Sequence, residues 1–272
     1  MKKLFMTLCA LSLMTLSANA WDASSRVATV GKTLLEKNGL PTTITFNVVE
    51  GVADNSEATT TNIINISKED LTYAGNDSEV AAVVSNEIGH IINGQTSKSK
   101  MREMAKAAIT SKLSADNLLA TAANSEYITK KTNLNDEIAA DITGVDLMSK
   151  TGYNPLAMVV LITKRPTTST LEVIQGKPNN SDRAMNTFNY LSYAYPAKIS
   201  AGYGCQEYRN FLSYANPIVE ARNASAKKLA KFNKEQAKAQ AKRAKDIAQY
   251  KSTGVSGWDT SYQLLQAFTE AK

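Results

Sequence analysis

Residues 78–94 constrain the fold more than any other part of the chain. Their valines and isoleucines stand at positions 80, 83, 84, 88, 91 and 92, which is the spacing of one apolar face of an α-helix. Asn76, Asp77 and Ser78 offer N-cap side chains just before this pattern. The segment also carries Glu87 and His90, and His90 is the one histidine in the sequence. We therefore predict an amphipathic helix that presents Glu87 and His90 one turn apart.

Residues 86–90 read Asn-Glu-Ile-Gly-His and match the zinc-binding helix motif HExxH at all but its first position. In the intact motif, two histidines on one helix face bind zinc, and the glutamate between them activates a water. Asn86 replaces the first histidine. An amide oxygen is a weaker ligand for zinc than an imidazole nitrogen, so we expect zinc to bind weakly or not at all.

A second motif lies about fifty residues downstream. Residues 137–141 read Glu-Ile-Ala-Ala-Asp, and residues 152–155 read Gly-Tyr-Asn-Pro. In this order and spacing, the two motifs resemble the HtpX/BepA-like zinc metallopeptidases, gluzincins of the group that includes the CAAX prenyl proteases. The resemblance covers about residues 27–190. The competing interpretation, two amphipathic helices with an incidental Glu and His, explains the joint spacing less well.

The resemblance implies a role for each matching residue. Glu87 would be the general base, and His90 and Glu137 would be zinc ligands. Asn86 occupies the position of the missing ligand. Asp141 would hydrogen-bond to a ligand residue and so orient it.

Two further positions are implied by the same resemblance. The family has a His-Pro pair followed by an arginine, and here the pair reads Lys177-Pro178, followed by Arg183. Lys177 and Arg183 are therefore candidates for contacts with a substrate or a transition state. In this family an extended substrate pairs with a strand near the site, and residues 62–66 are the candidate strand.

Two functions remain open from the sequence. In the first, the protein is a zinc-dependent endopeptidase, impaired by Asn86, in which a metal-activated water hydrolyses peptide bonds. In the second, it is an inactive pseudopeptidase whose groove binds extended or misfolded polypeptides. A cysteine-protease mechanism is disfavoured for Cys205, because no second histidine exists to pair with a thiolate.

The N-terminus predicts export. Lys2 and Lys3 precede an apolar run to Leu16, and the small-x-small sequence of residues 18–20 forms a cleavage site. We expect a signal peptide over residues 1–20 and a mature chain in the periplasm or outside the cell. No later apolar run is long enough to span a membrane.

The remaining patterns define the fold class and the domains. Helical spacing over residues 22–37, 98–119, 135–150, 183–190 and after Pro155, with short strands over residues 44–49 and 62–66, predicts a mainly helical α+β protein. The strands suggest a hairpin or small sheet, and residues 193–217 show no clear period. We predict a metallopeptidase-like domain over residues 21–217 and a basic helical extension over residues 218–272.

This extension carries most of the positive charge. Residues 222–251 hold ten lysines and arginines against Glu235 and Asp246, whereas the whole chain has a net charge of +6. A long helix over residues 221–251 is expected, followed by a short one over residues 258–272. It is either a solvated helix or a peripheral contact for an anionic envelope surface. No nucleic-acid partner is expected in that compartment.

Overall fold

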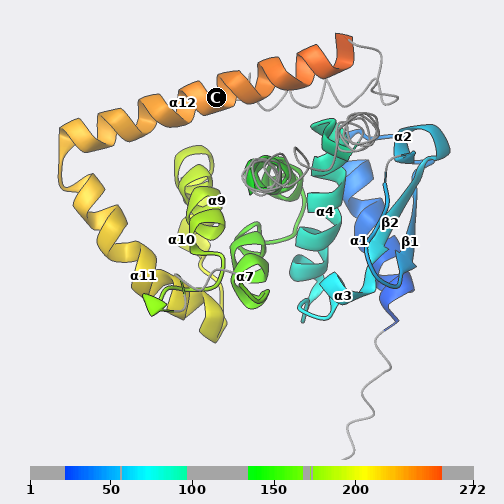
Figure 1. Ribbon diagram of the computed structural model, residues 1–272, viewed down its shortest axis with the longest axis horizontal. Coiled ribbons are helices and arrows are strands. Elements are labelled where there is room, and N and C mark those ends of the chain that lie inside the picture. The colour runs from blue at the N-terminus through cyan, green and yellow to red at the C-terminus, as the bar shows by residue number, and fades with distance from the viewer. Residues whose placement is uncertain (1–21, 56, 97–133, 168–171, 173, 253–272) are drawn as a thin grey trace, which may run out of the picture.

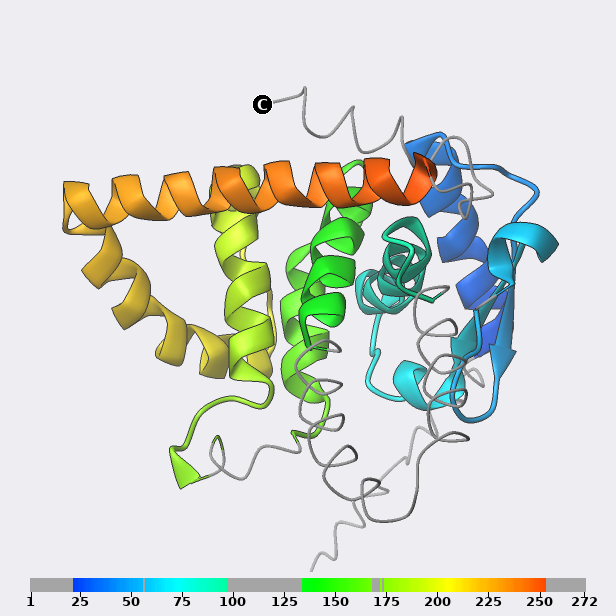
Figure 2. The same cartoon turned by 45° about the horizontal axis from the view of Figure 1, so that its top comes forward.

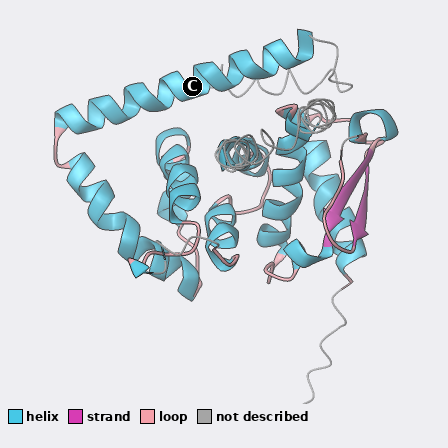
Figure 3. Ribbon diagram, viewed as in Figure 1, coloured by secondary structure: helices cyan, strands magenta, loops and turns pink. Residues whose placement is uncertain are grey.

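The computed structural model describes residues 22–55, 57–96, 134–167, 172 and 174–252. Within these residues the chain is mainly helical, with one two-stranded sheet at an edge of the molecule (Figures 1 and 3). The predicted class, a mainly helical α+β domain with a small sheet, is confirmed. The predicted signal peptide and the helices predicted over residues 98–119 and 258–272 lie outside the described residues.

Helix α1 and the sheet form the first layers. Helix α1 (Ala23–Asn38) begins after Asp22, whose carboxylate accepts hydrogen bonds from two backbone N–H groups, and it ends at Gly39 in the left-handed conformation. One face of α1 packs on β1 (Thr45–Val49), and another face packs on α4.

The two strands are parallel, so the hairpin alternative was wrong. Strand β1 pairs with β2 (Ile63–Ser67) in a register that places Thr45 opposite Ile63. A parallel pair needs a crossover connection of about a dozen residues. Residues 50–62 supply it, and they include the short helix α2 (Ala58–Thr61).

Helix α4 is the centre of the core. The short helix α3 (Lys68–Leu71) leads into α4 (Asp77–Ile92), whose N-cap residue Asn76 accepts a hydrogen bond from the N–H of Glu79. This is the helix that the apolar spacing predicts. Its residues are buried on nearly every side because α1, the sheet and α7 all pack around it.

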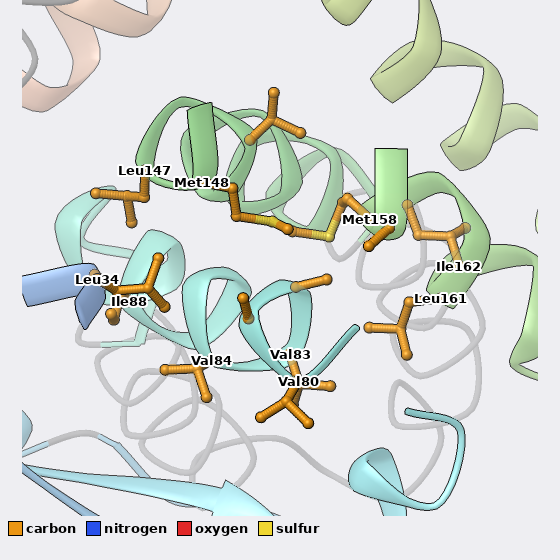
Figure 4. Packing of buried hydrophobic residues seen from close by; sticks show 14 of the residues in the cluster. Leu34, Val80, Val83, Val84, Ile88, Leu147, Met148, Met158, Leu161 and Ile162 are labelled. Carbon is orange, nitrogen blue, oxygen red and sulfur yellow. The ribbon is translucent and has the colours of Figure 1, made fainter. Parts of the chain in front are cut away.

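Two helices cover the far side of α4. One spans residues 134–149, and the other is α7 (Leu156–Lys164), which starts after Pro155 as predicted. Figure 4 shows Leu147, Met148 and Met158 of these helices directed toward the α4 layer that carries Val84 and Ile88. At this crossing, a Cβ on Gly89 would lie 2.5 Å from the carbonyl oxygen of Ala140. Only glycine allows the two backbones to approach so closely.

Helices α9, α10 and α11 pack around α7 and one another. Helix α9 (Ser181–Ala194) packs on α7, α10 (Pro196–Ala201) packs on α9, and α11 (Gln206–Asn223) packs on α7. The sequence showed no period over most of α10 and α11 because few of their residues are buried. Tyr208, Phe211 and Ala215 are the buried residues of α11, and α10 has none.

Helix α12 (Ala226–Ser252) runs across one side of the molecule, over α9 and the helix of residues 134–149 (Figures 1 and 2). Its buried residues include Gln240 and Ile247. The predicted domain boundary at residues 217 and 218 falls inside α11, and that division stays a prediction. None of the described helices is both long and apolar enough to cross a membrane.

Candidate active site and its ion-pair network

Two crossing helices bring the predicted site residues together. Helix α4 supplies Asn86, Glu87 and His90, and the helix of residues 134–149 supplies Glu137 and Asp141. Each pair spaced by four residues, 86 with 90 and 137 with 141, lies on one face of its helix. The close backbone approach at Gly89 lets these two faces meet.

One half of the cluster joins the two predicted metal ligands. The Nε2 atom of His90 lies 3.3 Å from Oε1 of Glu137. The second carboxylate oxygen of Glu137 lies 2.8 Å from Nη2 of Arg183, which α9 supplies. Glu137 is thus held between an imidazole and a guanidinium group.

The other half joins Asn86 to Asp141. Asn86 donates a hydrogen bond of 2.8 Å from its amide nitrogen to Oδ1 of Asp141. Arg183 donates two more, from Nε to Oδ2 at 2.6 Å and from Nη2 to Oδ1 at 2.7 Å. Asp141 is fully buried, so these three donors replace the water that its carboxylate would otherwise bind. Arg183 contacts both carboxylates and ties the two halves together.

Glu87 connects the cluster to the sheet through Asn55. The Nδ2 atom of Asn55 donates to Oε2 of Glu87 and to the carbonyl oxygen of Asn65 on β2, both at 3.0 Å. The Oδ1 atom of Asn55 accepts from the N–H of Asn65 at 2.7 Å. Because Asn55 bonds both backbone groups of Asn65, it occupies the place that a neighbouring strand would take on β2.

Burial and the neighbouring charges shift the pKa values of Glu87, His90 and Glu137 in different directions. Burial raises the pKa of Glu87, and this effect exceeds the lowering by His90 and Asn55. Burial lowers the pKa of His90, but the hydrogen bond and charge of Glu137 outweigh it and raise the pKa. Burial raises the pKa of Glu137, whereas Arg183 and His90 lower it to about 2. Glu137 is therefore ionised near neutral pH.

The donor set does not fit a three-ligand zinc site. His90 and Glu137 are correctly placed side by side, but Asn86 directs its amide nitrogen, a hydrogen-bond donor, at Asp141. Arg183 lies against Glu137 with its own positive charge. Among the described residues, no group of three or more His, Cys, Asp or Glu side chains could hold a metal ion.

Six of the seven predicted site residues belong to this cluster: Asn86, Glu87, His90, Glu137, Asp141 and Arg183. Lys177 lies elsewhere and lines a hollow together with Lys164 and Glu207. The sequence analysis missed Asn55, because it lies in an irregular segment and nothing local marks an asparagine as a partner of a distant glutamate. The catalytic and ligand roles of the seven residues stay predictions.

A helix carrying Glu-x-x-His, crossed by a second helix carrying a glutamate, defines the class of metallopeptidase-like domains. The chain belongs to peptidase family M48, whose family model matches residues 22–192. The predicted resemblance is thereby confirmed at the level of the family. No curated protein and no solved structure matched the chain. M48 peptidases are in general zinc-dependent, so the donor set of this chain departs from its family.

Proposed function

We propose that this M48 protein has lost, or nearly lost, peptide-bond hydrolysis and acts in the cell envelope by binding extended or misfolded polypeptides. One observation carries the proposal: the amide nitrogen of Asn86 is bonded to Asp141, where the family places a histidine ligand. The predicted signal peptide over residues 1–20 supports export to the periplasm or beyond.

The charge balance supports the same proposal. Arg183 contacts both Glu137 and Asp141 and offsets part of their negative charge without any metal ion. A metal would require His90 and Glu137 to give up their mutual contact and Glu137 to loosen its contact with Arg183. Both changes oppose metal binding, in addition to the missing ligand.

The edge of β2 is the proposed place for a polypeptide. The two backbone groups of Asn65 bond the side chain of Asn55 and not β1. The side-chain amide of Asn55 donates to the carbonyl oxygen of Asn65 and accepts from its N–H group, as one residue of an added antiparallel strand would. An extended polypeptide that displaced Asn55 would keep these two hydrogen bonds and would also release Oε2 of Glu87.

A second candidate function is a slow metallopeptidase. Its support is that the residues matching the family's general base and two of its ligands are present as Glu87, His90 and Glu137, with His90 and Glu137 in contact. The half-buried Glu87 carboxylate has a raised pKa, which suits a general base.

The test uses the untagged mature protein, purified without chelators. Its zinc content is measured first by elemental mass spectrometry, and its binding and cleavage of unfolded casein are then followed together. We expect little zinc, no cleavage, and binding that survives both a chelator and Glu87→Gln. Near-stoichiometric zinc with cleavage that a chelator and Glu87→Gln both abolish would establish the peptidase. Absence of binding and cleavage would reject both functions for this substrate class.

A further inference from the structure

Helix α12 carries a continuous stripe of lysines. Lys227, Lys231, Lys234, Lys238, Lys242 and Lys245 follow one another at intervals of three or four residues, which places them on one face of the helix. All six are exposed. Lys231 and Lys242 keep 76% and 75% of their side-chain surface accessible. We call these six residues the lysine stripe.

The opposite face of α12 is held against the body of the protein. Gln240 and Ile247 are buried there, and the guanidinium group of Arg243 is paired with the fully buried Asp146. Nearer the start of the helix, Phe232 lies under the guanidinium group of Arg222, at 3.8 Å from the ring centroid. These anchors fix the rotation of α12 about its axis and turn the lysine stripe outward.

Little acidic charge accompanies the stripe. Glu235 and Asp246 lie at its flank, within 3.7 Å of Lys231 and 2.6 Å of Lys242 respectively. At about 1.5 Å per residue, the 27 residues of α12 form a rod about 40 Å long. Figures 1 and 2 show this rod as nearly straight along one side of the molecule. The stripe is thus a long, straight and cationic edge.

We propose that the lysine stripe docks on the surface of an anionic lipid bilayer, with α12 lying parallel to the membrane plane. A straight row of flexible point charges suits a flat field of anionic headgroups. The stripe contains no large apolar residue, so it would stay at the level of the headgroups and not insert.

The same composition disfavours nucleic acid as the partner. The stripe has no arginine for bidentate contacts and no aromatic residue for stacking on bases. The arginines of this region, Arg222 and Arg243, are engaged with Phe232 and Asp146. Binding to a lipid surface requires neither kind of contact, so the charge and the straight shape of the lysine stripe are sufficient.

The test measures co-sedimentation of the full mature protein with phosphatidylcholine vesicles, with and without phosphatidylglycerol. We expect binding only when phosphatidylglycerol is present, and loss of binding at high salt because the attraction is screened. The variant Lys231→Gln/Lys234→Gln/Lys238→Gln should weaken the apparent affinity at least about tenfold. Circular dichroism checks that this variant is folded.

The matched control is Lys32→Gln/Lys37→Gln/Lys68→Gln, which removes three exposed lysines outside α12. It should bind vesicles like the unchanged protein. The proposal is overturned if the unchanged protein does not bind anionic vesicles, or if both triple variants weaken binding equally, since net charge alone would then be responsible. Tighter binding to a short DNA duplex than to phosphatidylglycerol vesicles, at the same salt and charge concentration, would overturn the proposal and identify a nucleic-acid surface instead.

Discussion

Two buried aspartates on the helix of residues 134–149 each face an arginine from a distant helix. Asp141 pairs with Arg183 of α9, and Asp146 pairs with Arg243 of α12. Both carboxylates are fully buried, and both receive additional neutral donors. By charge and burial alone the two sites are nearly equivalent.

Their surroundings distinguish them. The partners added around Asp146 are the hydroxyl groups of Tyr190 and Tyr195, which stay protonated because burial and the nearby Asp146 raise their pKa values. Arg183, the partner of Asp141, also contacts Glu137, which contacts His90, and both of these groups have shifted pKa values. The Asp146–Arg243 pair therefore stabilises the fold, whereas the Asp141–Arg183 pair belongs to the candidate site. The titratable groups next to each pair distinguish the two.

The largest expected effect concerns the pair formed by Asp146 and Arg243. Arg243→Met would leave Asp146 buried without its cation, and we expect a loss of about 3–5 kcal/mol in the free energy of unfolding, measured with urea. The neighbouring exposed residue provides the control, Lys242→Met, which should change stability by less than about 0.5 kcal/mol. A loss below about 1 kcal/mol for Arg243→Met would mean that α12 is not needed to stabilise Asp146.

A second prediction concerns metal binding at the candidate site, next to the Asp141–Arg183 pair. Asn86→His restores the missing ligand, so zinc at a hundred times its dissociation constant should stabilise this variant by about 2.7 kcal/mol, seen as a rise in melting temperature. Asn86→Gln, which keeps an amide, should show no such rise. If Asn86→His also fails to respond to zinc, the charge of Arg183 on Glu137 is a further obstacle.

The smallest expected effect concerns Glu172, which stabilises the start of the helix that carries Arg183. Glu172 accepts hydrogen bonds from the N–H groups of Asn180 and Ser181, at the start of α9. Burial raises the pKa of Glu172, but the hydrogen bonds from Thr167, Ser181 and Asn180 outweigh it and hold the pKa below its ordinary value of 4.5. A carboxylate with a lowered pKa stabilises the fold above its ordinary pKa, and this contribution is lost as the pH falls.

Glu172→Gln should therefore cost about 1 kcal/mol near neutral pH. The difference from the unchanged protein should shrink below pH 4.5. Urea unfolding at several pH values measures this. A difference that is constant with pH would show that the charge of Glu172 is not what stabilises α9.

The sequence predicted those elements whose information is local. The spacing of valine and isoleucine, with the Asn76 cap, predicted α4 to within about a turn, and α1 and α7 followed from similar signals. No period was found over residues 193–217, because α10 and α11 bury too few side chains. The parallel pairing of β1 and β2 was missed because short strands carry no sign of their direction.

For the site, the sequence by itself determined which side chains two helices could present: Asn86, Glu87 and His90 on one, Glu137 and Asp141 on the other. The spacing of four residues within a helix fixes which of them share a face. Only the tertiary structure decided which groups meet across helices. Asn55 reaches Glu87 over 32 positions, Arg183 reaches Asp141 over 42, and Arg243 reaches Asp146 over 97. Such partners are selected by packing of the whole chain, because a buried carboxylate needs donors but does not specify from which segment they come.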